Sequence, residues 1–210
     1  MFIMEDLFLL NIPTRMYEPN YYDQYESQSS MFNGLSGFNL RSDILNCHSC
    51  PLDCYTKSVH SQNMNLPIMI IGSKPSDINF DTENGKVLKQ LINMSEFNHH
   101  DIYRTSAVKC EESNDFIACH HYLISEIIIS NPKIIITLGI DAGNQLFENL
   151  KNPGSMIKLP IGSDVLATYS LEEISQNVDN YNAAIDHFKL CKQQYDYLQQ
   201  HNFQVQSNTV

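Results

Sequence analysis

Six cysteines form the clearest chemical pattern in the sequence, because five of them lie in two groups far apart along the chain. Cys47 and Cys50 form a C-x-x-C pair within the segment CHSCPLDC, a spacing that lets two thiolates reach one metal centre from a tight turn. Cys110 and Cys119 bracket a short loop before an expected helix, so they can supply two more ligands. By count, four thiolates suit either tetrahedral zinc or an iron–sulfur cluster.

Other residues near these cysteines compete for the same role. Cys54 in the first group and His120 beside Cys119 are rival ligands. A cysteine can also be a small buried hydrophobic residue, and this is our interpretation of Cys191, which lies alone in the C-terminal segment. In an intracellular protein, cysteines bind metal or do chemistry more often than they form structural disulfides.

The bulk composition excludes a membrane protein and a small disulfide scaffold. A chain of 210 residues, with 42% hydrophobic and 18% charged residues, is long enough for one buried core. No apolar run approaches the roughly 20 residues that span a bilayer. The apolar N-terminus carries Glu5 and Asp6 and lacks the basic region of a signal peptide. We therefore expect a cytoplasmic protein with no membrane partner, in the host cytoplasm if the Asn- and Ile-rich composition reflects a phage.

The net charge of −11 argues against a protein that coats nucleic acid, because such binding depends on Lys and Arg side chains that neutralise phosphates. Any contact with DNA must therefore be local. A modest basic group lies in the middle of the chain and consists of Lys74, Lys86, Lys89, Arg104 and Lys109. Scattered solvated side chains explain this group equally well.

Four short apolar segments predict the strands that position these residues. The expected strands are residues 66–72, 101–108, 133–139 and 164–169, and three of them are continuously apolar, as buried parallel strands are. The expected helices are residues 116–130, which Asn131-Pro132 ends, residues 140–150, and a long helix from about 170 to 201. The pattern predicts an α/β fold, a three-layer α/β/α sandwich with a central four-stranded parallel sheet.

This organisation divides the chain into three parts. The domain is expected over residues 41–201, between an N-terminal extension of residues 1–40 and a flexible tail of residues 202–210. The extension mixes tyrosines and apolar residues without a period, which is typical either of a surface for a protein partner or of a segment packed on its own domain. Ligands of such sheets lie beyond the carboxyl ends of the strands, which is where we expect the site.

Six short blocks follow one another from residue 47 to about residue 175. They are CxxCPL, an apolar strand ending in GSKP, TSAVKC, CxxYLxxEI, NPKIIITLG and a late ATY. In this order they resemble the iron–sulfur-containing uracil-DNA glycosylases, commonly called family 4. The resemblance implies a sandwich fold that binds DNA, extracts uracil and hydrolyses its bond to the sugar. It also implies a 4Fe-4S cluster near the DNA-binding surface, held here by Cys47, Cys50, Cys110 and Cys119, with zinc as the alternative.

The chain departs from this family at the positions that act on uracil. Base excision requires a flipped-out nucleotide in a pocket, a placed water and stabilisation of the departing base. Ser73 replaces the acidic residue of the family, Ser106 its uracil-reading asparagine and Ser170 its histidine. Phe80 stands in for its stacking phenylalanine. The resemblance places the base pocket and DNA-binding surface at Gly72, Ser73, Lys74, Pro75, Ser76, Phe80, Thr105, Ser106, Lys109, Thr168, Tyr169 and Ser170.

Few residues remain that can do the chemistry. Asp77 is the candidate catalytic carboxylate, with Asp81 as a second. The candidate general acids are His99, His100, His120 and His121, although a solvated or capping role suits each of these side chains. We therefore expect an iron–sulfur, DNA-binding member of the superfamily with lost or altered base excision, acting in DNA replication or repair as an accessory or scaffold. The alternatives are an active glycosylase for uracil or another modified base, and a zinc-stapled interaction module with no role on DNA.

Overall fold

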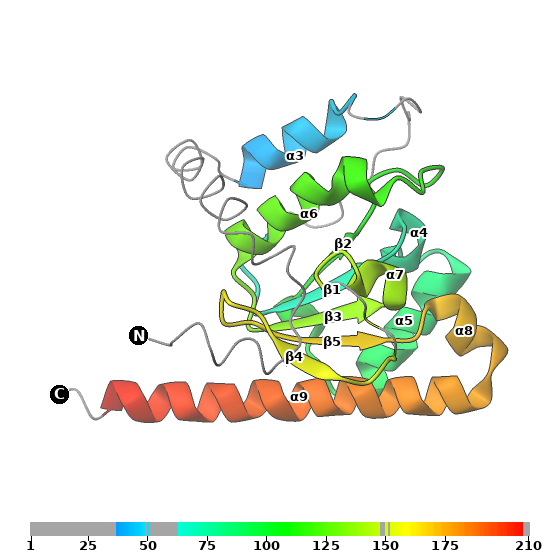
Figure 1. The fold of residues 1–210 in the computed structure, drawn as a ribbon. Coiled ribbons are helices and arrows are strands. Elements are labelled where there is room, and N and C mark those ends of the chain that lie inside the picture. The colour runs from blue at the N-terminus through cyan, green and yellow to red at the C-terminus, as the bar shows by residue number, and fades with distance from the viewer. Residues whose placement is uncertain (1–36, 49, 51–62, 148–149, 151, 208–210) are drawn as a thin grey trace.

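One mixed sheet of five strands forms the centre of the protein, in the order β2-β1-β3-β5-β4 (Figure 1). The computed structural model describes residues 37–48, 50, 63–147, 150 and 152–207. The four parallel strands are β1 (Ile68–Gly72), β2 (Ile102–Ser106), β3 (Ile134–Leu138) and β5 (Asp164–Thr168). The predicted α/β fold and its four parallel strands are confirmed. The fifth strand, β4 (Met156–Lys158), pairs antiparallel with β5 and was not predicted.

Helices cover both faces of the sheet, as the three-layer prediction requires (Figure 1). On one face lies α6 (Phe116–Ser130), with α3 (Gly37–Leu45) packed outside it, and on the other lie α5 (Glu83–Met94) and α9 (Val178–Ser207). Three shorter helices follow the carboxyl ends of strands, and they are α4 (Pro75–Ile78), α7 (Ile140–Gly143) and α8 (Leu171–Gln176). The short 3-10 helix η2 (His99–Asp101) precedes β2.

The bounds of α6 agree with the prediction because both ends carry clear signals. The side chain of Asp115 accepts a hydrogen bond from Ala118 N at 3.0 Å, and Asn131 ends the helix in the left-handed conformation with a φ of 44°. Two other helix predictions were inaccurate. The α-helix after β3 spans only Ile140–Gly143, and the long C-terminal helix is two helices, because Asn177 adopts an extended conformation between α8 and α9. Helix α9 also runs past the boundary expected at residue 201.

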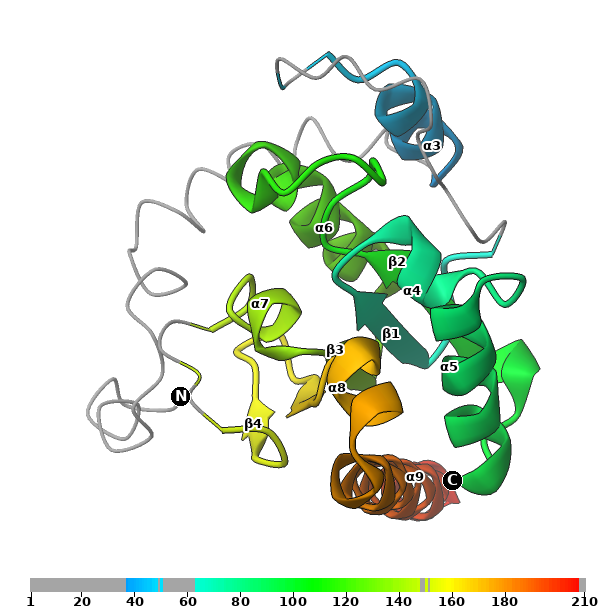
Figure 2. The same cartoon turned by 90° about the vertical axis from the view of Figure 1, so that its right-hand side faces the viewer.

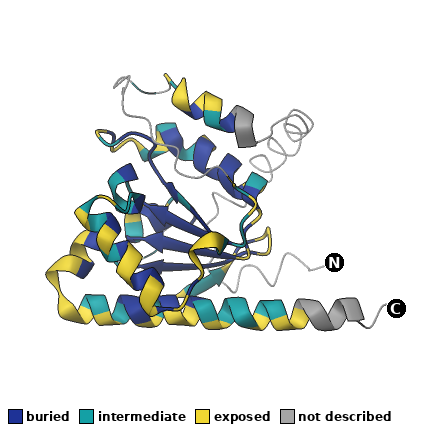
Figure 3. Cartoon of the chain, turned by 180° about the vertical axis from the view of Figure 1, so that it is seen from behind, coloured by how far each residue is buried: buried dark blue, intermediate teal, exposed yellow. Residues whose placement is uncertain are grey.

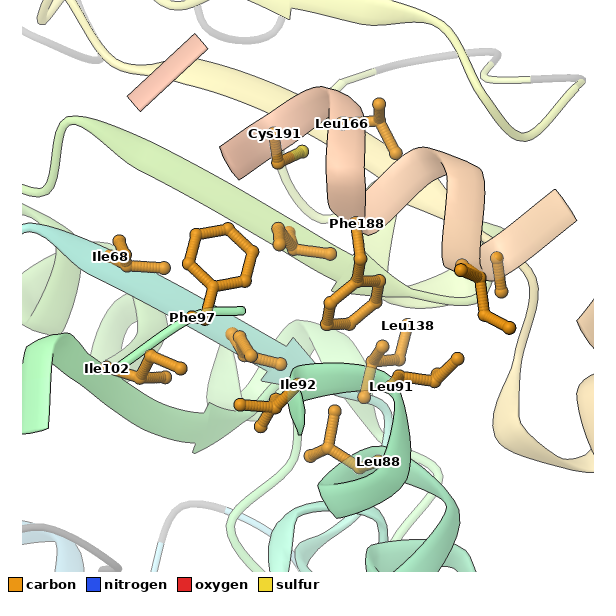
Figure 4. Packing of buried hydrophobic residues seen from close by; sticks show 14 of the residues in the cluster. Ile68, Leu88, Leu91, Ile92, Phe97, Ile102, Leu138, Leu166, Phe188 and Cys191 are labelled. Atoms are coloured by element: carbon orange, nitrogen blue, oxygen red, sulfur yellow. The ribbon is translucent and has the colours of Figure 1, made fainter. Parts of the chain in front are cut away.

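Two hydrophobic clusters hold the layers together, one on each face of the sheet. On the α5 and α9 face, Ile68 and Leu166 from the sheet pack with Leu88 and Phe188 (Figure 4). On the α6 face, alternate residues of the same strands form the second cluster with residues of α6 and α7. Cys191 lies fully buried in the first cluster, as its interpretation as a small hydrophobic residue requires, and burial raises the pKa of its thiol to about 12.

The strands are buried along their length, whereas the outer sides of the helices are exposed (Figure 3). Every residue of β1, β3 and β5 is buried, which explains why their sequences are nearly continuous apolar runs. In the edge strand β2 only Arg104 is partly exposed. Within the described part of the chain, no helix is long and apolar enough to cross a bilayer.

Candidate functional site

Three loops meet beyond the carboxyl ends of β1, β3 and β5 (Figure 2). The hydroxyl of Ser73, in the loop after β1, lies 3.4 Å from Leu138 O at the end of β3. Gly139 follows with a φ of +92°, and a Cβ atom there would come within 3.2 Å of Ser170 Cβ. The sheet therefore places Ser73 and Ser170, which the sequence assigns to one pocket, on either side of the end of β3.

Asp77 holds the loop after β1 in place. Its Oδ2 accepts hydrogen bonds from the backbone N–H groups of Ser73 and Lys74 at 2.9 and 3.0 Å, and its Oδ1 accepts one from the side-chain amide of Asn84 at 3.0 Å. Gly72 allows this close approach, because a Cβ atom there would lie 2.7 Å from Asp77 Cβ. These bonds give Asp77 a structural role, whereas a base that activates water needs an oxygen directed at the substrate.

The next residues of this loop are also committed to contacts within the protein. Pro75 is buried at the start of α4. The backbone N–H and hydroxyl of Ser76 donate to the two carboxylate oxygens of Glu111, at 2.8 and 2.7 Å. Sequence reasoning missed Glu111, which joins the loop after β2 to α4. Lys74 remains as the partly exposed cation of the loop.

Lys109 is buried, an arrangement that does not support its predicted contact with DNA. Its Nζ lies 2.6 Å from Glu126 Oε2, and each of these side chains is only 2% exposed. The same Nζ donates to Thr105 Oγ1 at 2.9 Å and to Ser106 O at 2.6 Å. Thr105 Oγ1 in turn donates to Glu126 Oε2 at 2.8 Å, so the Thr105 hydroxyl belongs to the same buried network. A buried charge needs such partners, and Glu126 of the CxxYLxxEI block was the signal that sequence reasoning overlooked.

The hydroxyls of the other two pocket serines are engaged in their own loops. Ser106 is buried, and its Oγ donates to Val108 O at 2.6 Å. Ser170 caps the start of α8, where its Oγ accepts from Glu173 N at 3.2 Å and its backbone N–H donates to Glu173 Oε2 at 2.8 Å, as does its hydroxyl. This reciprocal arrangement is a capping box, which stabilises the helix terminus. Both serines therefore have structural roles.

His187 of α9 lies against the end of β5 and was not predicted. Its Nδ1 is 2.9 Å from Thr168 Oγ1, and its ring stacks on Tyr169 at 6.0 Å between centroids. A Cβ atom on Gly154 would lie 2.5 Å from His187 Nε2, so the ring fits against that glycine. Burial lowers the pKa of His187, although Asp186 opposes the shift. Because α9 lies far along the chain, no local motif links this histidine to Thr168 or Tyr169.

Phe80 follows α4 and lies beside Arg104 of the edge strand β2. Its ring centroid is 3.7 Å from the guanidinium carbon of Arg104, in the middle of β2, and 5.7 Å from the ring of His99, which precedes β2. The Arg104 guanidinium covers one face of the Phe80 ring, so a base could stack only on the other face, and the stacking role stays a prediction. The candidate acids also lie elsewhere, with His99 and His100 in η2 and His120 and His121 in α6.

The four predicted cysteine ligands come from three segments around α6. Cys47 and Cys50 follow α3, Cys110 follows β2, and Cys119 lies in the first turns of α6. The thiol of Cys119 accepts a hydrogen bond from the backbone N–H of Lys109. Burial raises the pKa of Cys119, Lys109 opposes the shift, and negative charge on Cys47 and Cys50 raises the pKa further. Cys47 packs against the cluster of Leu40, Ile44 and Tyr122, so the segment after α3 lies close to α6.

By number and type, these four thiols suit either a 4Fe-4S cluster or a tetrahedral zinc ion. Among the side chains that the structure places, no three of the Cys, His, Asp or Glu type converge on a single point, as a mononuclear site requires. A 4Fe-4S cluster takes one thiolate at each of four irons, so its ligands surround it at wider spacing. Cys54, a rival ligand, lies outside the described residues.

Comparison with known proteins supplies the remaining observation. The model of the uracil DNA glycosylase superfamily matches residues 60–195. The type-4 uracil-DNA glycosylase of Pyrobaculum aerophilum is 31% identical over 120 residues, which cover 50% of this chain and 61% of that protein. The type-4 uracil-DNA glycosylase of Saccharolobus solfataricus is 30% identical over 128 residues, which cover 53% of this chain and 59% of that protein. That of Sulfurisphaera tokodaii is 28% identical over 152 residues, covering 64% and 69%. The chain thus spans about three fifths of the first two relatives.

Proposed function

The chain belongs to the uracil-DNA glycosylase superfamily, and from this premise we propose that it binds DNA through the glycosylase fold while excising uracil weakly or not at all. One observation carries the proposal. At the three positions where the resemblance expects an acidic residue, an asparagine and a histidine, the chain has Ser73, Ser106 and Ser170, whose hydroxyls donate to Leu138 O, Val108 O and Glu173. These donors are directed at the protein itself.

The chemistry of base excision explains why this matters. The departing base carries negative charge in the transition state, and a positioned donor or cation stabilises it. Losing one such group typically costs about 10²- to 10³-fold in rate. Losses within one catalytic unit are not additive, so the effects of the three serines cannot be multiplied. The expected outcome is a small residual rate with DNA binding retained, which suits an accessory or scaffold role in replication or repair.

The cysteines support an iron–sulfur centre in this protein. Cys47 and Cys50 would hold it from the segment after α3, Cys110 from the loop after β2, and Cys119 from the start of α6. When bound, the centre supplies a crosslink between segments about sixty residues apart, which restricts the unfolded chain. Lys109 contributes a backbone hydrogen bond and a positive charge beside Cys119, both of which favour the thiolate that a ligand must provide.

Two assays on the same oligonucleotides test the proposal. Single- and double-stranded DNA with one uracil is incubated with the protein and treated with alkali, which cleaves abasic sites, while fluorescence anisotropy measures binding. We expect binding that weakens with salt and little strand cleavage. Robust cleavage at uracil would overturn the proposal and establish the alternative, an active glycosylase with a rearranged pocket. Protein that binds no DNA at any salt concentration would overturn it as well.

A further inference from the structure

Three basic side chains surround one aromatic ring on the side of the molecule where β2 forms the edge of the sheet. The guanidinium carbon of Arg104 lies 3.7 Å from the centroid of the Phe80 ring, and Lys89 Nζ lies 5.8 Å from it. The ring of His99 meets Phe80 edge to face, at 5.7 Å and 87°. These residues, which we call the Phe80 cluster, come from three elements, the segment between α4 and α5, helix α5, and the η2–β2 segment.

The charges of the Phe80 cluster are not neutralised by carboxylates. In the part of the chain that the structure describes, neither Arg104 nor Lys89 forms an ion pair, whereas Lys86, one turn away on α5, lies 2.6 Å from Glu83. The pKa of His99 is lowered by burial first, and then by Arg104, Lys89 and His100. Arg104 and Lys89 therefore place positive charge close to His99, although the whole chain carries a net charge of −11.

Arg104 is held in a fixed position at the centre of this cluster. Its Nη1 donates to Ile78 O at 2.5 Å, and its guanidinium is stacked on the Phe80 ring. A guanidinium has five N–H donors in a planar fork that matches a phosphate, and a preorganised fork loses little entropy on binding. The side chain is half-buried without a carboxylate, an arrangement that an anion from outside would stabilise.

We propose that the Phe80 cluster binds the phosphate backbone of a DNA strand, at a contact separate from the pocket beyond the strand ends. That the ligand of the Phe80 cluster is DNA rests on the proposed function, and the position of α4 supports this assignment. This helix starts after Lys74, in the pocket loop, and ends just before Phe80. A strand that leaves the pocket along α4 therefore reaches Arg104 and Lys89, and Lys74 lies at the start of that path.

Two lysines on one helix provide a matched test. Lys89→Gln removes a cation of the cluster, and Lys86→Gln removes the neighbouring cation that is already paired with Glu83. Both side chains are exposed on α5, so neither variant should disturb the fold. Anisotropy with a uracil-free single-stranded oligonucleotide is measured over a salt series. For Lys89→Gln we expect weaker binding and a salt slope reduced by about 0.7 for one lost phosphate contact, with Lys86→Gln unchanged.

A second variant probes the geometry of the guanidinium. Arg104→Lys keeps the charge but loses the planar fork, so we expect weaker binding with nearly the same salt slope. Its circular dichroism spectrum and unfolding midpoint show whether the fold is retained. Unchanged affinity and slope in both Lys89→Gln and a folded Arg104→Lys would overturn this inference and leave the proposed function standing. No DNA binding by the unaltered protein would overturn both.

Discussion

Lys109 and Glu126 form an ion pair inside the protein, with Nζ and Oε2 2.6 Å apart and both side chains 2% exposed. The pair joins the loop after β2 to the middle of α6. The backbone of Lys109 also donates to the thiol of Cys119 in the first turns of the same helix. The tyrosine hydroxyl of Tyr103 completes the network by donating to Glu126 at 2.7 Å. One buried charge pair therefore sets the position of the two cysteines on either side of the loop.

Replacing Lys109 by Met should destabilise the protein by about 3–5 kcal/mol, because Glu126 would remain buried without a cation. Urea denaturation measures the change. Lys86→Met is the matched control, since its pair with Glu83 is exposed and should contribute only about 0.2–1 kcal/mol. The double variant Lys109→Met with Glu126→Leu should recover part of the loss. Equal stability of the two single variants would contradict the structural role of the pair.

Replacing Cys110 by Ala should lower the iron and sulfide content of protein purified without oxygen, and should also lower its unfolding midpoint, because the crosslink is lost. Cys191→Ala serves as the control, since Cys191 lies in the hydrophobic core among α9 and the sheet. The iron content of that variant should not change. Unaltered protein with neither iron nor zinc, or Cys110→Ala with undiminished iron, would exclude this ligand assignment.

Replacing Ser170 by His should raise the rate of uracil excision, because it returns an imidazole to the position where the resemblance expects one. The change also removes the hydroxyl that caps α8, at a cost of about 0.5–2 kcal/mol. Ser170→Ala loses the same cap without gaining the ring, so the pair of variants separates the two effects. If the rates of both variants equal that of the unaltered protein, the missing histidine is not what limits excision.

Stability should fall as the pH is lowered below about 6.5, and His187 should contribute to the fall. Burial lowers the pKa of His187 in the folded protein below its value of about 6.5 in the unfolded chain. At a pH between the two pKa values the unfolded chain binds more protons than the folded protein, so lowering the pH favours unfolding. His99 and His121 shift in the same direction. Urea titrations across this range should show a shallower pH dependence for His187→Gln than for the control His201→Gln, an exposed position. Identical pH dependences would exclude a contribution from His187.

Deleting residues 2–35 tests the predicted partner surface of the N-terminal extension, most of which lies outside the described residues. If tyrosines and apolar side chains there bind a second copy or another protein, the deletion should change the mass measured by light scattering or abolish partner capture. Lower stability with unchanged assembly and capture would instead favour packing against its own domain.

The sequence predicted most of the parallel sheet because a strand covered on both faces must be apolar at nearly every position. The segments around Ile70, Ile136 and Leu166 satisfy this condition. The same reasoning did not predict β4, because this strand has only three residues, its side chains are not fully buried, and its pattern is too short to recognise. Helix α6 was predicted with its bounds, and Asn131-Pro132 marked its end, whereas Asp115, which caps its start, was not used in the prediction.

The site was less predictable because its chemistry depends on pairs far apart in the chain. The sequence around Lys109 and Cys110 gave no indication that Lys109 pairs with Glu126. Lys109 was therefore predicted to contact DNA, although the structure gives it a structural role. Phe80 was placed in the pocket by alignment with a motif, whereas Arg104 holds it at the edge of the sheet. His187 could not be connected with Thr168 before the fold of α9 was known.

The short antiparallel strand β4 determines how much backbone is exposed at one edge of the sheet, where a strand of another copy could pair. The inner strands contain segments such as KIIIT, which are rich in residues that favour β-structure. Such segments can aggregate when their backbone hydrogen-bonding groups are exposed. A second copy of the protein that approaches the β4 edge of the sheet meets only the backbone of Met156–Lys158. Lys158, 59% exposed and 2.7 Å from Asp164, adds a charge there. Short edge strands and edge lysines oppose the addition of further strands, so this edge protects the folded protein from growing into a fibril.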